Sequence, residues 1–186
     1  MNARFRISDS IALIRNIKTT GTITPSSGSL IRELLASIDF DNTTAIVELG
    51  SGTGCVTKAL LRRMRPDARL ICMELDNEFV YRLNALNDKR IHVYNACASS
   101  IRGVLDDQHI NKVDYIVSSL PLALMNDDVV SQILTSAQDN LSDNGRFLQY
   151  QYSLANYGDI KNVFDQVKLR FTLRNMPPAF VYDCSN

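Results

Sequence analysis

Thr44-Ala45-Ile46-Val47-Glu48-Leu49-Gly50-Ser51-Gly52-Thr53-Gly54 is the stretch of this sequence that decides the fold. The apolar run Ala45–Leu49 predicts a short buried strand, and apolar residues recur at helical spacing from Thr53 to Met64. The three glycines between them allow the backbone to turn tightly against a ligand. Together these features predict a strand, a loop and a helix that bind a cofactor.

The spacing of the glycines indicates which cofactor. A dinucleotide-binding loop has the order G-x-G-x-x-G, which would place a glycine where this chain has Cys55. The order here is E-x-G-x-G-x-G, which resembles motif I of class I S-adenosylmethionine (SAM) methyltransferases. The resemblance implies that the loop packs against the methionine part of SAM, with Glu48, Gly50, Ser51, Gly52, Thr53 and Gly54 as cofactor-binding residues.

A second acidic residue closes the next apolar run. Glu74 follows Gly54 by 20 positions, where the class I methyltransferases carry a carboxylate that binds both ribose hydroxyls of SAM. A carboxylate that accepts two hydroxyl hydrogen bonds is a strong, charge-assisted anchor. The resemblance therefore assigns Glu74 and its neighbour Leu75 to the cofactor site. The alternative is a glycine turn followed by an ordinary surface glutamate.

Length and composition indicate a globular domain of ordinary size. The chain has 186 residues, 45% of them hydrophobic and 22% charged, which is enough to bury a core without disulfides or metal. Its formal net charge is zero, so we expect no nucleic-acid partner. The four cysteines lack C-x-x-C spacing, which predicts no metal site and favours a reducing cytoplasm. We see neither a secretory signal nor an apolar run long enough to span a membrane.

Strand and helix patterns alternate after the glycine loop. Strands are predicted at Ala45–Leu49, Leu70–Glu74, Ile91–Tyr94, Val113–Val117, Arg146–Tyr150, Val167–Leu173 and Phe180–Tyr182. Helices are predicted at Ser27–Ile38, Thr53–Met64, Asn77–Leu86, Ser99–Leu105, Asp127–Leu141 and Tyr157–Val163. This order predicts an α/β, doubly wound, mostly parallel seven-stranded sheet, the Rossmann-like fold of SAM methyltransferases, in which the last two strands form a hairpin. Ligands of such sheets bind at the carboxyl ends of the strands, where Gly50, Glu74, Ala96 and Ser118 should converge.

The first 24 residues differ from the rest. We predict an N-terminal basic amphipathic arm at residues 1–24 and a methyltransferase domain at residues 25–186. Residues 1–18 carry a net charge of +3, and Ile7, Ile11, Ile14 and Ile17 share one face of a helix. Such an arm can bind an anionic membrane surface, which favours a peripheral position on the inner face of the membrane. The alternative is a surface helix that packs on its own domain.

Two further segments are candidates for the substrate side of the site. The fourth predicted strand runs into Ser118-Ser119-Leu120-Pro121-Leu122, where many amine-directed methyltransferases carry N/D-P-P-Y to hold the target nitrogen. The missing aromatic residue disfavours a flipped nucleobase, which is usually held by stacking. Tyr150 and Tyr152 end the fifth strand, and a ring face there can hold an amine headgroup by cation–π attraction. The alternatives are an ordinary loop and core tyrosines.

Six short motifs in order resemble the bacterial phospholipid N-methyltransferase family. They are Arg15-Asn16, Gly21 to Ser27, Glu48 to Gly54, Ser119 to Leu122, Gly145 to Tyr150 and Arg174 to Ala179. That family converts phosphatidylethanolamine through its mono- and dimethyl forms to phosphatidylcholine, so the resemblance implies a SAM-dependent phospholipid N-methyltransferase. The site then comprises catalytic Ser119, Tyr150 and Tyr152, substrate-binding Leu120, Pro121 and Arg174, and cofactor-binding Ala96, Cys97 and Ser118. Arg174 would pair with the lipid phosphate, or is a surface arginine.

Two positions depart from that family. Its members commonly read N-G-D-A after the third strand, with the Asp contacting adenine, whereas this chain has Asn95-Ala96-Cys97-Ala98. Either backbone groups hold adenine, or Asn95 substitutes, or SAM binds more weakly. Ser119 stands where the family usually has glycine, which adds bulk beside the expected cofactor pocket.

Methyl transfer to an amine needs mainly the alignment of nitrogen, carbon and sulfur. The sequence shows no obvious catalytic base, because neither histidine follows a segment at the cofactor edge. Three other functions fit part of the pattern. These are an adenine N6-methyltransferase of ribosomal RNA, a small-molecule amine methyltransferase, and a non-catalytic module that binds SAM. The sequence carries no signal for the oligomeric state.

Overall fold

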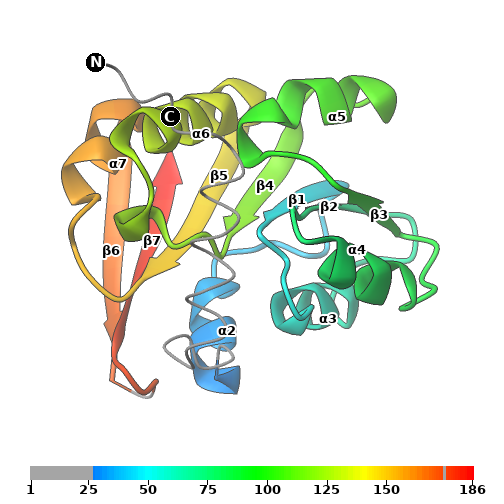
Figure 1. Ribbon diagram of the computed structural model, residues 1–186, viewed down its shortest axis with the longest axis horizontal. Helices are drawn as coiled ribbons and strands as arrows, with labels where there is room; N and C mark the ends of the chain where they lie inside the picture. Colours follow the sequence, from blue (N-terminus) through cyan, green and yellow to red (C-terminus); the bar gives the residue numbers. More distant parts are fainter. Residues whose placement is uncertain (1–26, 174) are drawn as a thin grey trace.

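The computed structural model describes residues 27–173 and 175–186, which form one seven-stranded sheet with helices on both faces (Figure 1). The strands are β1 (Ala45–Leu49), β2 (Arg69–Met73), β3 (Ile91–Tyr94), β4 (Val113–Ser118), β5 (Leu141–Gln151), β6 (Gln166–Thr172) and β7 (Ala179–Ser185). Their order is β3-β2-β1-β4-β5-β7-β6, and only β7 runs antiparallel to its neighbours. The predicted doubly wound sheet and its final hairpin are confirmed. The predicted arm and Arg174 lie outside the described residues.

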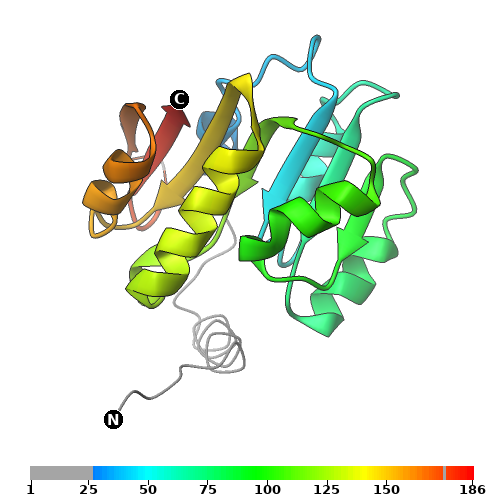
Figure 2. The same cartoon turned by 90° about the horizontal axis from the view of Figure 1, so that it is seen from above.

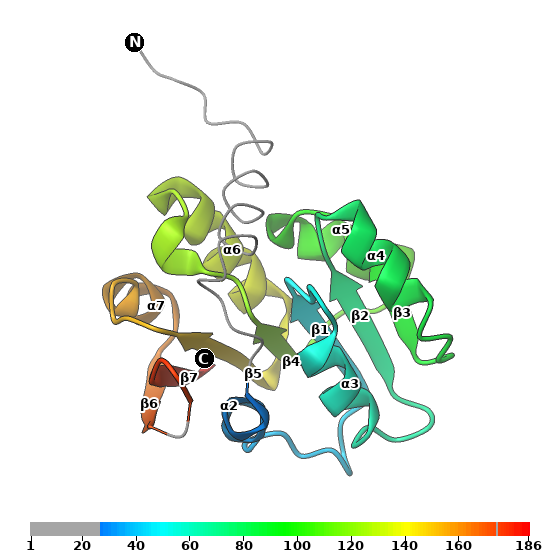
Figure 3. The ribbon, with the colours of Figure 1, turned by 60° about the horizontal axis from the view of Figure 1, so that its bottom comes forward.

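The helices fall into two groups, one on each face of the sheet. They are α2 (Gly28–Leu34), α3 (Cys55–Leu61), α4 (Asn77–Asn84), α5 (Ile101–Asp107), α6 (Asp127–Asn140) and α7 (Tyr157–Val163), with short 3₁₀ turns η1 (Ala98–Ser100) and η2 (Leu122–Leu124). Buried side chains of α2, α3 and α4 pack into one apolar cluster, and those of α5, α6 and α7 into another. Figure 3 shows α2 and α3 on the opposite side of the strands from α5 and α6. Both faces are therefore covered, which is why β1 is buried along its whole length.

Most element boundaries agree with the sequence patterns, and the differences have local causes. The helix predicted from Thr53 begins at Cys55, because Gly54 has a φ of +78° and a left-handed residue cannot belong to an α-helix. The first helix ends at Leu34 rather than Ile38, because the backbone of Leu35, with a ψ of 5°, no longer has α-helical geometry. Strand β5 begins five residues earlier than predicted, because Leu141 already pairs with Val113 of β4.

The strand order places β1 at the point where the chain changes direction across the sheet. β1 lies between β2 and β4, with Leu49 opposite Met73 on one side and Ser118 on the other. The residues that follow these strands, among them Gly50, Glu74 and Ser119, therefore lie side by side at the carboxyl edge. Seen from above, the sheet runs from β6 and β7, in orange and red, to β1–β3 at the other end (Figure 2). This is the position where doubly wound sheets bind ligands.

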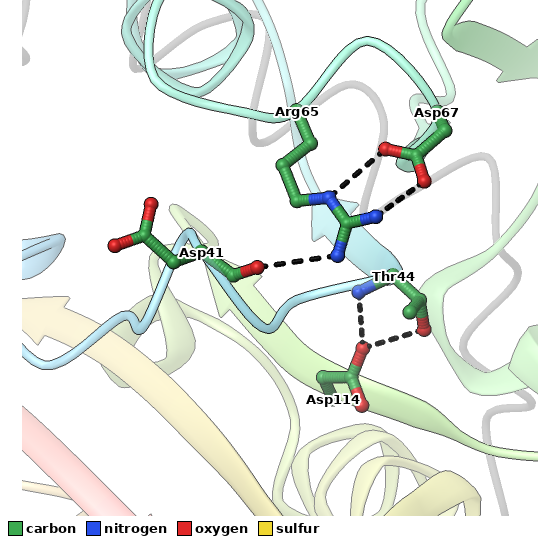
Figure 4. A network of polar contacts seen from close by, with 5 residues as sticks. All are labelled: Asp41, Thr44, Arg65, Asp67 and Asp114. Carbon is green, nitrogen blue, oxygen red and sulfur yellow. Dashed lines mark hydrogen bonds and ion pairs between the residues drawn. The ribbon is translucent and has the colours of Figure 1, made fainter.

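A polar network fixes the opposite, amino edge (Figure 4). Asp114 Oδ2 accepts hydrogen bonds from the Thr44 backbone N–H at 2.7 Å and its hydroxyl at 2.9 Å, which joins the start of β1 to β4. Beside it, the Arg65 guanidinium donates to the Asp41 carbonyl at 3.2 Å and pairs with Asp67. Side-chain hydrogen bonds thus hold the start of β1, and the glycine loop follows directly at its other end.

Within the residues that the structure describes, no helix combines the length and the apolar character needed to cross a bilayer.

Candidate functional site

The glycine loop after β1 requires its glycines for conformation and for space. Gly50, Gly52 and Gly54 have φ values of +72°, +52° and +78°, a region that other residues rarely adopt. The Gly50 N–H donates to the Met73 carbonyl at 2.9 Å, which holds the loop against β2. A Cβ atom on Gly50 would lie 2.7 Å from Leu120 Cδ2, so the loop also packs closely against the segment that follows β4.

Glu74 joins the glycine loop to the turn that opens α4. Its Oε2 accepts the Gly52 N–H at 2.7 Å, and its Oε1 accepts the N–H groups of Leu75 at 2.9 Å and Asp76 at 3.0 Å. The side chain is buried, and backbone hydrogen bonds offset the cost of burying its charge. The predicted ribose-binding carboxylate is therefore fixed beside the loop before any ligand arrives.

Glu48 lies beneath the loop as a fully buried carboxyl group. Thr57 Oγ1 donates to its Oε2 at 2.7 Å, and the Cys72 thiol lies 3.4 Å from the same oxygen. Burial raises the pKa of Glu48 to about 7, and these two hydrogen bonds oppose the rise. The neighbouring Ser51 side chain also hydrogen-bonds to this carboxyl group and opposes the rise in its pKa.

The residues that follow β3 are hydrogen-bonded to the end of β2 beside Glu74. Asn95 Nδ2 donates to the carbonyls of Glu74 at 3.1 Å and Leu75 at 2.9 Å, so its amide group ties β3 to the end of β2. Ala96 and Cys97 are half-buried beside it, and Cys97 Sγ lies 3.2 Å from Ser99 Oγ. Because Asn95 Nδ2 is already engaged, only its Oδ1 atom could contact adenine. The role of Cys97 stays a prediction.

The segment after β4 contacts the glycine loop on one side and β5 on the other. The Ser119 N–H donates to the Leu49 carbonyl at 3.0 Å, and the Leu120 N–H to Ser118 Oγ at 3.3 Å. The Leu120 carbonyl accepts the side-chain amides of Gln149 at 2.9 Å and Gln151 at 3.2 Å. Both lone pairs of this carbonyl are thereby occupied, so the two glutamines fix the position of the segment after β4 against β5.

Sequence analysis missed these two glutamines. Both are buried in β5, where an apolar residue is the usual occupant, and that anomaly in Gln149-Tyr150-Gln151-Tyr152 was the available signal. Gln149 Nε2 donates to the carbonyls of Leu120 and Tyr150, so its Oε1 atom faces elsewhere and lacks a partner among the described residues.

The structure separates the predicted roles of Tyr150 and Tyr152. Tyr150 is buried in the apolar cluster with α2 and α3, and its ring contacts Tyr152 edge-on at 5.8 Å between centroids. Tyr152 is half-buried nearer the carboxyl edge, and burial raises the pKa of its phenol. Of the two rings, only that of Tyr152 is partly exposed, and the catalytic role of both tyrosines stays a prediction.

Two buried polar atoms at this edge lack hydrogen-bond partners within the described part of the chain: Ser119 Oγ and Gln149 Oε1. Buried polar groups of native proteins are normally paired, so this pair of atoms indicates a polar ligand. Together with a glycine cradle that a Cβ would fill and the fixed Glu74 carboxylate, the residues fit SAM and a neighbouring hydrogen-bond donor. Across residues 27–173 and 175–186, no group of three or more His, Cys, Asp or Glu side chains is arranged to hold a metal.

Comparison with known proteins agrees with this geometry. Residues 46–145 match the family model described as a methyltransferase domain. The ornithine lipid N-methyltransferase of Singulisphaera acidiphila is 30% identical over 166 residues, which cover 88% of this chain and 86% of that protein.

Solved structures share the fold at low sequence identity. The 1,6-didemethyltoxoflavin-N1-methyltransferase of Burkholderia thailandensis, with bound S-adenosylhomocysteine, matches with a TM-score of 0.70 and 13% identity, covering 100% of this chain and 94% of that one. A TehB-like SAM-dependent methyltransferase of Corynebacterium glutamicum matches with a TM-score of 0.63 and 12% identity, covering 97% of this chain and 100% of that one.

The close packing of Gly50 generates a first prediction. Gly50→Ala places a Cβ 2.7 Å from Leu120 Cδ2, so either the loop or the Leu120 side chain has to shift, and a φ of +72° strains any residue with a Cβ. We expect the Kd for SAM to rise at least about tenfold and stability to fall by about 1–2 kcal/mol. Gly103→Ala in α5 is the matched control, because its added Cβ meets no atom within 4 Å. Equal SAM affinities of Gly50→Ala and the unchanged protein in isothermal titration would contradict the loop assignment.

The buried Glu48 generates a second prediction, on pH. Its folded-state pKa of about 7 lies above the ordinary value of 4.5, so its contribution to stability is full below pH 4.5 and is lost as the pH rises through 7. The loss is on the order of 3 kcal/mol. Glu48→Gln cannot ionise, and we expect urea unfolding at pH 5 and pH 8 to show a smaller difference for it than for the unchanged protein. Parallel profiles for the two proteins would show that Glu48 does not titrate in this range.

Proposed function

The chain belongs to the methyltransferase-domain family and is a SAM-dependent methyltransferase, and from this premise we propose that it methylates the primary amine of a membrane lipid. The observation that carries the proposal is the pair of buried oxygens without partners among the described residues at the ends of β4 and β5, Ser119 Oγ and Gln149 Oε1. A primary amine brings N–H donors, and these atoms are able to accept them.

The residues of the chain supply binding and alignment. When bound, SAM supplies a methyl group on a sulfonium, which an uncharged amine can attack in line. Glu74, Glu48 and the glycine loop would hold it at the end of β1, and the segment Ser118–Pro121 would hold the amine beside it. Alignment of this kind can supply on the order of 7–11 kcal/mol of barrier reduction. The buried surroundings also penalise the ammonium form, so they favour the uncharged amine that attacks.

Two lipid headgroups fit the proposal. The relative from Singulisphaera acidiphila is named for ornithine lipid, and the motifs of this chain resemble a family that acts on phosphatidylethanolamine. Both lipids carry a primary amine. We propose phosphatidylethanolamine as the substrate, converted towards phosphatidylcholine, with the predicted contact of Arg174 to the phosphate as the feature that favours it. Residues 1–18 would hold the protein on an anionic membrane surface.

The test is transfer of label from methyl-labelled SAM. We expect the full chain to label lipid in vesicles that contain phosphatidylethanolamine, and to label it faster than ornithine lipid in matched vesicles. Vesicles of phosphatidylcholine alone are the control. Faster labelling of ornithine lipid would overturn the headgroup assignment, and label that enters RNA or free ethanolamine but never lipid would overturn the lipid proposal.

Gln149 and Gln151 provide a matched pair of variants. Both side chains donate to the Leu120 carbonyl, but only Gln149 also has a buried Oε1 without a partner. If that atom accepts the amine N–H, Gln149→Leu lowers kcat/KM about 100-fold, and Gln151→Leu lowers it about tenfold or less. SAM affinity, measured by titration, should change little in either variant. Equal losses in the two variants would show that Gln149 acts only by holding Leu120.

A further inference from the structure

Large exposed apolar side chains are concentrated at the edge of the sheet that holds the site. Among the described residues seven such side chains are well exposed, and Tyr81 on α4 is the one that lies apart from the strands β4 to β7 and their connections. Five of the other six lie on the segments that follow β4, β5 and β6 or at the end of β6: Leu124, Leu154, Phe171, Leu173 and Met176. We call these five side chains the apolar rim.

The exposed fraction of the apolar side chains increases along β6 and the turn that follows it, towards this edge. Leu169 is 39% exposed, Phe171 54%, Leu173 74%, and Met176 in the turn that follows 85%. Leu169 and Phe171 alternate along the strand and so lie on one face with Val167, which packs against the core at the start of the strand. Leu173 follows directly after the strand ends at Thr172. The Phe171 ring is held by Phe180 of β7 at 4.8 Å between centroids. The hairpin is therefore anchored in the core while its tip presents apolar groups.

The rim is continuous with the site. Strand β6 runs parallel to β5, because both are antiparallel to β7, so its end lies at the same carboxyl edge as the ends of β1 and β4. Leu124 lies in η2, four residues beyond the Leu120 that packs against Gly50. A surface that covers the rim would therefore also face the carboxyl edge at which the site residues lie.

We infer that the apolar rim enters the interfacial layer of a lipid bilayer and brings the site to the headgroup amine. The inference rests on the proposed function, because an amine that is fixed at headgroup level can reach the site only if the membrane approaches this edge. The N-terminal connection supports the same occupant. The Ser27 N–H donates to Asn175 Oδ1 at 3.3 Å, so the 26 preceding residues, with their basic and isoleucine-rich pattern, join the domain beside the hairpin tip.

The chain contains no tryptophan, so one introduced residue reports its own surroundings. We expect Leu173→Trp to shift its emission to the blue when phosphatidylethanolamine and phosphatidylglycerol vesicles are added, and to be quenched by brominated acyl chains. Tyr81→Trp is the matched control, because Tyr81 is 77% exposed but lies on α4, and its emission should not change.

A second measurement uses loss of apolar surface. Each leucine-sized side chain that leaves water contributes a factor of roughly ten to partitioning. The double variant with Leu173→Ser and Met176→Ser should therefore bind these vesicles at least about tenfold more weakly in sedimentation, and Tyr81→Ser should bind as the unchanged protein does. SAM titration checks that the variants are folded. On dihexanoyl phosphatidylethanolamine below its micellar concentration, the double variant should retain its methylation rate.

Three outcomes would overturn the inference while leaving the proposed function intact. One is unchanged vesicle binding of the double variant. Another is a Leu173→Trp emission that is already blue-shifted without vesicles, which would mean that the chain itself covers the rim. The third is a concentration-dependent dimer that the double variant loses, which would mean that a second copy covers it. If neither the unchanged protein nor any of the variants methylates the short-chain lipid, that result would instead count against the proposed function.

Discussion

The carboxylate of Glu74 is the interaction on which the site depends. It accepts backbone N–H groups from Gly52, Leu75 and Asp76, and so joins a left-handed loop to the turn at the end of the neighbouring strand. Backbone N–H groups in such a loop point away from any regular hydrogen-bond ladder, and a buried negative charge is tolerable only where several donors meet it. Each therefore stabilises the other. The loop and the predicted ribose-binding carboxylate are therefore held together as one unit.

A second unit connects the cofactor loop to the predicted amine site. Leu120 packs against Gly50, and its carbonyl is fixed by Gln149 and Gln151. The position of the segment after β4 is therefore set on one side by the glycine loop and on the other by β5. Catalysis by alignment requires that donor and acceptor be placed by the same rigid elements. Under the proposed function, this arrangement would meet that requirement without a dedicated base, since burial itself favours an uncharged amine.

The sequence predicted the parts of this structure that depend on local pattern. Apolar runs located the five parallel strands β1 to β5, because a parallel sheet covered on both faces needs nearly continuous apolar segments, and alternating apolar residues located β6 at the antiparallel edge. The glycine spacing located the loop and Glu74. The start of α3 was missed because the conformation of Gly54 depends on the turn that it closes. The glutamines of β5 were missed because their partner is the Leu120 carbonyl, 29 residues away from Gln149 in the sequence and visible only once β4 and β5 are paired.

The topology also explains why the hairpin can serve the substrate side. In the parallel part of the sheet each strand leads from the carboxyl edge into a helix that returns across a face, so the connections at that edge are drawn back towards the core. The antiparallel β7 removes this requirement, because β6 and β7 are joined directly by the short turn that contains Met176. No helix has to cover that turn. Exposed apolar side chains at this position cost little in packing, and they lie beside the predicted amine site, where a lipid headgroup would enter.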